Sequence, residues 1–383
     1  MPFFSFVSSK NSLSNLPQIL VPNKKYYSKD ISLWKHLNNI NKTENIVDLK
    51  KESRKKVNYI GAKILICFPP NFGLGDAIEY CIAIQSLIKI KKFEKIGIAF
   101  FSKYQFIFNK LLKGCDFYPL IVSEESIKNY DTIFHITLEI ENIYFQKYRR
   151  SDIANEICKY FKAPFADIKI QTNKKIKSLK TISMFPVASS IIRSLPFQII
   201  LKIADSLKDD YRLKVYIDDS NYSKNLEEEN SLKKIEFIKP NNVKELDEEI
   251  SKLEFGIFVD SGPLHLAKIY DKKGILIETS VSNKILLNNT KKIIPYNNLY
   301  ISKYCNGPCG LIDIFSFKKK IGCYETNALN FQEIKKLDNL RNLQRFDKNT
   351  SNKYFASNPV GCIKNIDSKK LLEFLRIKLK ECL

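Results

Sequence analysis

The spacing of apolar residues changes in a regular order along the chain from residue 62 onward. Residues 62–68 form a continuous apolar run, which predicts a strand that is buried on both faces. Residues 76–90 carry apolar side chains at helical spacing, and further apolar runs follow at 95–101 and 130–138. Buried strands that alternate with amphipathic helices are typical of parallel βαβ units. The pattern therefore predicts an α/β domain in this part of the chain.

The same alternation begins again near residue 180. Apolar runs predict a second set of strands at 180–187, 212–218, 234–240, 255–260 and 273–279. Helical spacing predicts helices at 196–209, 243–253 and 262–270. Two successive sets of this kind indicate two Rossmann-like, doubly wound α/β domains. Ligands bind such sheets at the carboxyl ends of their strands, so we expect a ligand cleft between the two domains.

The pattern divides the chain into four parts. We expect an N-terminal extension at 1–57, an N-terminal domain at 58–175, a C-terminal domain at 176–365 and a terminal amphipathic helix at 366–383. The extension is polar and rich in Asn, Lys and Ser, which predicts a partly irregular segment with one short helix around Trp34 to Leu37. The polar segment 170–180 is the expected boundary between the domains.

Composition and length are those of a globular, cytoplasmic protein. Of its 383 residues, 44% are hydrophobic and 27% are charged. The chain is longer than one that folds around a single hydrophobic core, so it predicts more than one domain. A membrane span needs about eighteen consecutive apolar residues. The best candidate, 185–204, is interrupted by Arg193, Gln198 and Lys202. The N-terminus has no basic lead before its apolar residues, so it does not predict a secretory signal.

The charge is strongly positive, with 63 basic against 41 acidic side chains and a net charge of +22. Such a balance favours an anionic partner, either a membrane surface or nucleic acid. The alternative is a lysine-rich bias spread over a solvated surface. The lysines are scattered, and the chain has no dense arginine block or nucleic-acid-binding motif. Peripheral contact with an anionic membrane is therefore preferred to nucleic-acid binding.

The turn in residues 69–80, PPNFGLGDAIEY, is the first candidate for chemistry. It contains Gly73 and Gly75, two of only twelve glycines in the chain. Glycine permits positive φ and close approach of a ligand to the backbone. Asp76 falls at the start of the next helix, where it is either a helix cap or a general base that faces the ligand. The turn is neither a Walker A loop nor a complete dinucleotide fingerprint.

The second candidate lies in residues 255–270, FGIFVDSGPLHLAKIY. Asp260 ends a predicted strand, Ser261 and Gly262 form a turn, and His265 lies in the first turn of the next helix. A helix N-terminus after a glycine turn binds phosphate through backbone N–H groups, and the histidine could donate a further hydrogen bond. The alternative is a capping acid followed by a surface histidine.

The third candidate is the loop in residues 185–200, FPVASSIIRSLPFQII. A strand ends in small polar residues that include Ser189, and Arg193 precedes a helix that begins with proline. The loop lies at the same predicted sheet edge as Asp260, where arginine could neutralise a diphosphate. The alternative is a solvated loop arginine.

These three motifs together resemble family 9 glycosyltransferases, the heptosyltransferase-like enzymes of lipopolysaccharide core synthesis. The matching elements are GLGDAI, a Pro-x-Ala stretch followed by a basic residue and proline, and DSGPLHLA, in that order over residues 62–383. The resemblance implies a GT-B fold of two Rossmann-like domains that face a central cleft. It also implies inverting transfer from a nucleotide-activated sugar, typically ADP-heptose, with no metal ion or organic cofactor.

The resemblance also implies roles for individual residues. Asp76 matches the catalytic base, with Gly73 and Gly75 in the acceptor loop. On the donor side, Asp260 contacts the sugar, and the remaining matches are Ser189, Arg193, Ser261, Gly262 and His265. Arg193 stands where the family usually has a lysine. Residues 278–284, ETSVSNK, stand where the family often has a Phe-Gly-Pro-Thr loop, which leaves the donor preference open.

The expected activity is sugar transfer, with heptose as the first candidate, to a lipid-linked or core-oligosaccharide acceptor of lipopolysaccharide or a related glycan. It would take place at the inner face of the cytoplasmic membrane. Three alternatives share parts of the pattern. They are a GT-B nucleotide-sugar epimerase, a non-catalytic protein that binds nucleotide sugars, and a basic nucleic-acid-binding protein.

Nine cysteines in a long chain without an export signal predict free thiols rather than a disulfide framework. Five of them lie after residue 300, and four of these, Cys305, Cys309, Cys323 and Cys362, are candidate metal ligands. Four thiolates would suffice for a structural zinc ion. The spacing lacks a second close pair, so packed thiols or a facultative disulfide are preferred to zinc.

Overall fold

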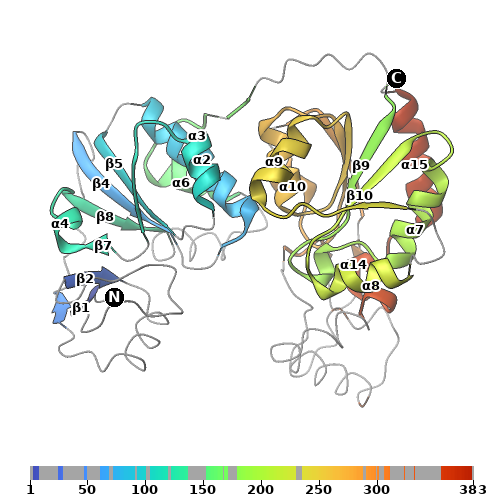
Figure 1. The fold of residues 1–383 in the computed structure, drawn as a ribbon, viewed down its shortest axis with the longest axis horizontal. Coiled ribbons are helices and arrows are strands. Elements are labelled where there is room, and N and C mark those ends of the chain that lie inside the picture. The colour runs from blue at the N-terminus through green and yellow to red at the C-terminus, as the bar shows by residue number, and fades with distance from the viewer. Residues whose placement is uncertain are drawn as a thin grey trace. The chain divides into compact units, whose positions relative to one another are not determined.

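The computed structural model contains two compact α/β units (Figure 1). The N-terminal unit comprises Met1–Lys147 and Ser151–Ile168, and the C-terminal unit comprises Tyr148–Arg150 and Lys169–Leu383. The structure describes residues 3–7, 25–28, 47–49, 61–68, 72–90, 93–100, 104–119, 122–136, 152–166, 168–170, 179–229, 235–287, 290–298, 300–301, 306–310, 323, 332 and 355–381.

A four-stranded parallel sheet forms the centre of the N-terminal unit. Its order is β6-β5-β4-β8. The strands are β4 (Ala62–Cys67), β5 (Phe93–Phe100), β6 (Asp116–Pro119) and β8 (Thr132–His135). The helices are α2 (Leu74–Lys89), α3 (Gln105–Leu111), α4 (Glu124–Ile127) and α6 (Ile153–Tyr160). The continuous apolar run predicted as a buried strand is β4, and the helical pattern after it is α2.

The N-terminal extension contributes strands to this unit. It contains β1 (Phe3–Val7), β2 (Lys25–Ser28) and β3 (Val47–Leu49). They pair antiparallel with one another, and β2 also pairs with β7 (Val122–Ser123), giving the sheet order β3-β1-β2-β7. The sequence analysis did not predict these strands, and the short helix that it places around Trp34 to Leu37 lies outside the described residues.

The C-terminal unit is built on a six-stranded parallel sheet of order β11-β10-β9-β12-β13-β14. Its strands are β9 (Thr181–Phe185), β10 (Arg212–Tyr216), β11 (Glu236–Ile238), β12 (Phe255–Phe258), β13 (Gly274–Ile277) and β14 (Ile293–Tyr296). Counted from β9, the spatial order is third, second, first, fourth, fifth, sixth, the order of a doubly wound sheet. The predicted α/β class is therefore confirmed. The strand order changes direction between β9 and β12.

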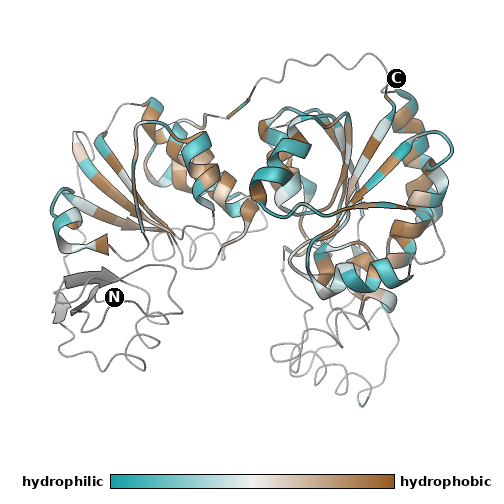
Figure 2. Ribbon diagram, in the orientation of Figure 1, coloured by the Kyte–Doolittle hydropathy of each residue, from teal (hydrophilic) through white to brown (hydrophobic). Residues whose placement is uncertain are grey.

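Helices cover both faces of this sheet. Figure 1 shows α7 (Phe197–Leu207) and α15 (Ser368–Glu381) on one side, with α9 (Val243–Ser251) and α10 (Gly262–Ile269) on the other. The shorter elements are η3 (Ile191–Arg193), α8 (Asn221–Glu229), α11 (Asn283–Leu286), α14 (Gly361–Lys364), β15 (Tyr300–Ile301) and β16 (Asn306–Gly307). In both units the helices present apolar and polar positions on different sides (Figure 2).

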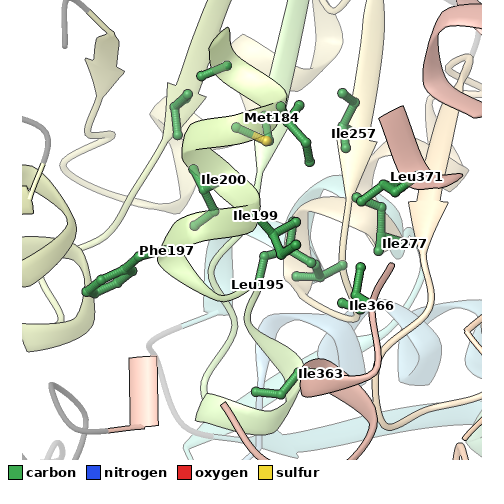
Figure 3. Packing of buried hydrophobic residues seen from close by; sticks show 14 of the residues in the cluster. Met184, Leu195, Phe197, Ile199, Ile200, Ile257, Ile277, Ile363, Ile366 and Leu371 are labelled. Atoms are coloured by element: carbon green, nitrogen blue, oxygen red, sulfur yellow. The ribbon is translucent and has the colours of Figure 1, made fainter. Parts of the chain in front are cut away.

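One hydrophobic cluster joins the sheet to α7 and α15 (Figure 3). Met184, Ile257 and Ile277 come from three neighbouring strands, and all three are 0% exposed. Leu371 of α15 packs into the same cluster. Burial of a large aliphatic side chain contributes roughly 1.5–3 kcal/mol. The core therefore holds the carboxyl ends of β9, β12 and β13 in fixed relative positions.

The opposite face of the same strands is aromatic. The ring of Phe258 stacks on Phe185, with ring centroids 5.3 Å apart. It lies so close to Gly256 and Gly274 that a Cβ at Gly274 would stand 2.7 Å from a Phe258 ring carbon and 2.4 Å from the Gly256 carbonyl oxygen. Glycine is needed at Gly274 because the neighbouring backbone leaves no room for a side chain.

Within the described residues, no helix is both long enough and apolar enough to cross a membrane.

Candidate functional site

The change of strand order in the C-terminal sheet brings two of the predicted site loops together. Strands β9 and β12 are neighbours, with Phe185 opposite Phe258, so the loops that follow them leave the same edge of the sheet. An Arg193 guanidinium nitrogen lies 3.2 Å from Asp260 Oδ2. The two side chains are 19% and 8% exposed. The alternative of a solvated loop arginine is therefore wrong, because Arg193 is largely buried and ion-paired.

Hydroxyl groups of the β9–α7 loop hold the arginine. Arg193 Nε donates to Ser190 Oγ at 3.4 Å, and a terminal guanidinium nitrogen donates to Ser189 Oγ. Ser194 stabilises the loop through two hydrogen bonds. Its Oγ accepts one from Ala188 N at 2.9 Å and donates one to the Ser190 carbonyl at 3.0 Å. Ser189 thus lies where the sequence predicts it. Ser190 and Ser194 are supporting residues that the sequence analysis did not assign.

Helix α10 begins beside this ion pair. Ser261 is the residue before its first turn, and the Ser261 hydroxyl donates to the Val259 carbonyl at 3.3 Å instead of capping the helix. Gly262 and Pro263 form the first turn. Free N–H groups and the helix dipole make such a terminus attractive to an anion, and Arg193 supplies a cation next to it.

His265 lies in the same first turn and is 8% exposed. The alternative of a surface histidine is therefore wrong. The predicted donor residues Ser189, Arg193, Asp260, Ser261, Gly262 and His265 all belong to the loops that follow β9 and β12 or to the start of α10. They gather at the carboxyl edge of the sheet where the strand order reverses, which is the usual ligand position in open α/β sheets.

Asp76 occupies the start of α2 in the N-terminal unit. Asp76 Oδ2 accepts a hydrogen bond from Gly73 N at 2.9 Å. This is the bond that a carboxylate in the first turn makes to the residue before the helix, so Asp76 does cap α2. The side chain is also exposed, which leaves the carboxylate accessible to solvent. Both roles that the sequence analysis gives to Asp76 are therefore compatible with its position.

Neither glycine of the acceptor loop uses the positive φ that glycine permits. Gly73 has φ −84° and ψ 170°, an ordinary extended conformation, and Gly75 lies inside α2. Close approach of a ligand to these positions stays a prediction. The loop rests on an aromatic cluster, in which the rings of Phe72 and Tyr80 lie 5.5 Å apart, and those of Phe68 and Tyr80 4.8 Å.

Three of the four cysteines considered as zinc ligands lie together in the C-terminal unit. Cys309, Cys323 and Cys362 are buried, and each is at most 5% exposed. Burial, together with the electrostatic effect of Cys309 and Cys323, raises the pKa of the Cys362 thiol to about 12. Cys305 lies outside the described residues. Among the residues that are described, no three His, Cys, Asp or Glu side chains are placed to hold a metal ion.

Comparison with solved structures identifies the fold. No family model matches the chain, and no curated protein sequence matches it. A family 9 glycosyl transferase from Veillonella parvula DSM 2008 superposes with a TM-score of 0.54 at 9% identity, covering 85% of this chain and 99% of that one. The chain has the fold of a family 9 glycosyltransferase. This agrees with the GT-B architecture of two doubly wound domains implied by the sequence motifs.

Two further structures are similar at lower TM-scores. The iron-containing dodecameric glycosyltransferase TibC from enterotoxigenic E. coli H10407 has a TM-score of 0.48 at 13% identity, covering 66% of this chain and 67% of that one. The E. coli heptosyltransferase WaaC, solved with ADP, has a TM-score of 0.44 at 10% identity, covering 61% of this chain and 92% of that one.

The buried ion pair generates a prediction about stability. Replacing Arg193 with Met leaves Asp260 buried without its cation, so unfolding free energy should fall by about 3 kcal/mol. Arg212→Met is the matched control, because the Arg212–Glu236 pair is exposed and should contribute less than about 1 kcal/mol. Urea denaturation of both variants measures the difference. Equal losses in the two variants would show that the Arg193–Asp260 pair is not buried.

The cysteine cluster generates a prediction about reactivity. With a pKa of about 12, the Cys362 thiol is almost wholly protonated at pH 8, and only the thiolate is alkylated. Iodoacetamide should therefore modify Cys362 far more slowly in the native protein than after urea unfolding, as measured by peptide mass spectrometry. If a chelator makes Cys362 react quickly in the native protein, the result would instead support the zinc alternative. Rapid labelling of native Cys362 without a chelator would contradict both the raised pKa and the zinc site.

Proposed function

We propose that the protein is a glycosyltransferase that takes a sugar, heptose in the first instance, from a nucleotide-sugar donor. The observation that carries the proposal is the Arg193–Asp260 pair beside the uncapped start of α10, at the point where the strand order reverses. A cation, backbone N–H groups and a buried histidine at one sheet edge suit a diphosphate.

In the proposed complex, the donor diphosphate replaces Asp260 as the partner of Arg193. The arginine and the N–H groups of α10 then face the phosphate oxygens, with His265 as a further donor of hydrogen bonds. Asp260, freed from the ion pair, accepts hydrogen bonds from sugar hydroxyls. Because the guanidinium is already held by Ser189 and Ser190, little ordering is needed when the donor arrives.

The proposed reaction is an inverting displacement at the anomeric carbon. An acceptor hydroxyl oxygen forms the new bond to that carbon as the bond to the diphosphate oxygen breaks. Asp76 takes the hydroxyl proton, and the electron pair of the broken bond stays on the nucleoside diphosphate. Arg193 and the α10 N–H groups stabilise the added negative charge, so the proposal assigns this task to the protein rather than to a metal ion.

The proposed acceptor is a lipid-linked or core-oligosaccharide glycan at the inner face of the cytoplasmic membrane. The net charge of +22 supports this proposal, because lysine-rich surfaces are attracted to anionic lipids and phosphorylated glycans. A second candidate is a protein that binds nucleotide sugars without transferring them. The hydrogen bond from Gly73 N to Asp76 favours it, since it explains Asp76 without catalysis.

A panel of nucleotides tests the donor site. ADP or another nucleoside diphosphate at millimolar concentration should raise the melting temperature, because a ligand that binds only the folded state stabilises it. Arg193→Met should abolish the shift. Turnover is then measured with ADP-heptose and UDP-sugars and with lipopolysaccharide-core acceptors. A melting temperature that no nucleoside diphosphate changes would remove both the transferase and the binding-protein proposals.

The Asp76→Asn variant separates the two candidates. The amide oxygen can still accept from Gly73 N, so the fold and donor affinity should stay nearly unchanged. Loss of the base should lower kcat by a factor of about 10²–10⁴. Asp131→Asn is the matched control, since Asp131 is also an exposed acid that accepts from a backbone N–H, at Lys63. Unchanged turnover in Asp76→Asn would exclude Asp76 as the base.

A further inference from the structure

A second buried carboxylate lies at the sheet edge that carries Asp260. Strands β12 and β13 run parallel, with Phe258 opposite Leu276. Two residues further along each strand, Asp260 and Glu278 leave the sheet at this edge. They are 6% and 1% exposed. Two desolvated acids on adjacent strands each require compensation, because burial of an unpaired charge is costly.

The two carboxylates are compensated in different ways. Asp260 has the guanidinium of Arg193. Glu278 instead accepts hydrogen bonds from three N–H groups. Its Oε1 accepts from Asn283 N at 2.8 Å and from Asn283 Nδ2 at 2.7 Å, and its Oε2 accepts from Asn298 N at 3.1 Å. Hydrogen bonds to a carboxylate are stronger than those between neutral groups.

These bonds close the turn formed by residues 278–283. Glu278 at its start is tied directly to Asn283 at its end, where α11 begins. The middle of the turn is held separately, since Gly310 N donates to the Ser280 carbonyl at 2.7 Å. Asn298 in turn donates through Nδ2 to the Cys362 carbonyl at 2.7 Å. The carboxylate therefore stands at the centre of the bonds that shape this turn.

The composition of the turn explains why it needs such a residue. Residues 278–283 read ETSVSN and contain no proline, so no ring fixes a backbone φ in the turn. A turn without this restraint loses more conformational entropy when it adopts one shape. A buried carboxylate that binds both ends of the turn supplies the missing restraint through hydrogen bonds.

The turn also carries an unsatisfied polar group. Thr279 is 1% exposed, and its Oγ1 is a shielded atom without a hydrogen-bond partner in the described part of the chain. A buried hydroxyl without a partner is unfavourable, so a second group that meets it would be stabilising.

We propose that Glu278 is a positioning residue for the donor site. It holds the turn 278–283 as a wall beside the Asp260 loop. This inference rests on the proposed function, because it assumes that the donor lies at the carboxyl edge of this sheet. Glu278 itself does not touch the donor, since its carboxylate oxygens are occupied by Asn283 and Asn298.

The test compares two buried acids of the same unit. Glu278→Gln keeps the size of the side chain but turns one acceptor into a donor that faces N–H groups. Asp247→Asn is the control. Asp247 lies on α9, outside the donor loops, is 2% exposed, and accepts a hydrogen bond from the Tyr270 hydroxyl at 2.9 Å. Calorimetry with ADP and UDP gives the affinity, and urea denaturation gives the stability.

Both variants should lose stability, but only Glu278→Gln should bind the nucleoside diphosphate about tenfold more weakly than the natural protein. Asp247→Asn should stay within twofold. If Glu278→Gln does not fold, Asn283→Ala removes one of the three N–H donors and should weaken binding about threefold. Hydrogen exchange over residues 278–286 should rise in the Glu278 and Asn283 variants and remain unchanged in Asp247→Asn.

The outcomes separate this inference from the proposed function. If the natural protein binds ADP or UDP and Glu278→Gln binds it equally well, the positioning role is wrong while the donor site stands. An equal loss of affinity in Asp247→Asn would also overturn it, because the effect would then be general destabilisation. If the natural protein binds neither nucleotide, the proposed function fails, and the positioning role fails with it.

Discussion

The ion pair between Arg193 and Asp260 depends on the reversal of strand order in the C-terminal sheet. Helices on either side of the reversal pack against opposite faces, and the loops after β9 and β12 leave the same carboxyl edge of the sheet. The side chains of Arg193 and Asp260 are 19% and 8% exposed at this edge, so both are largely removed from water. The arginine and the acid compensate each other there, and the surrounding serines fix their geometry.

Much of this arrangement could be predicted from the sequence because it follows from local runs of apolar residues. The apolar runs that became β4, β9, β12 and β13 are buried on both faces, and such strands have few alternatives to a parallel sheet. A parallel sheet then places the residues that follow each strand at one edge. Asp260 and Arg193, 67 positions apart in the chain, could therefore be assigned to one site before any distance was known.

Other features depend on partners that lie far away in the sequence. The strands of the N-terminal extension are short, and their pairing with β7 has no local signal. Glu278 reads as an ordinary polar residue at the end of a strand, because its three hydrogen bonds come from Asn283 and Asn298. The glycines before Asp76 permit either a positive φ or close approach of a ligand, and composition alone does not distinguish the two. The structure shows that Gly73 is extended.

The pairing of the extension with β7 has a consequence for synthesis of the chain. Tyr26 pairs with Ser123, so strand β2 cannot reach this partner until about a hundred further residues have been made. A ribosome that adds 5–20 residues each second needs roughly five to twenty seconds for that length. During this interval the hydrogen-bonding edge of β2 that later faces β7 is open to any other strand. The unpaired edge of β2 can therefore mispair in the nascent chain, and a chaperone that shields the emerging N-terminal segment would act in this interval.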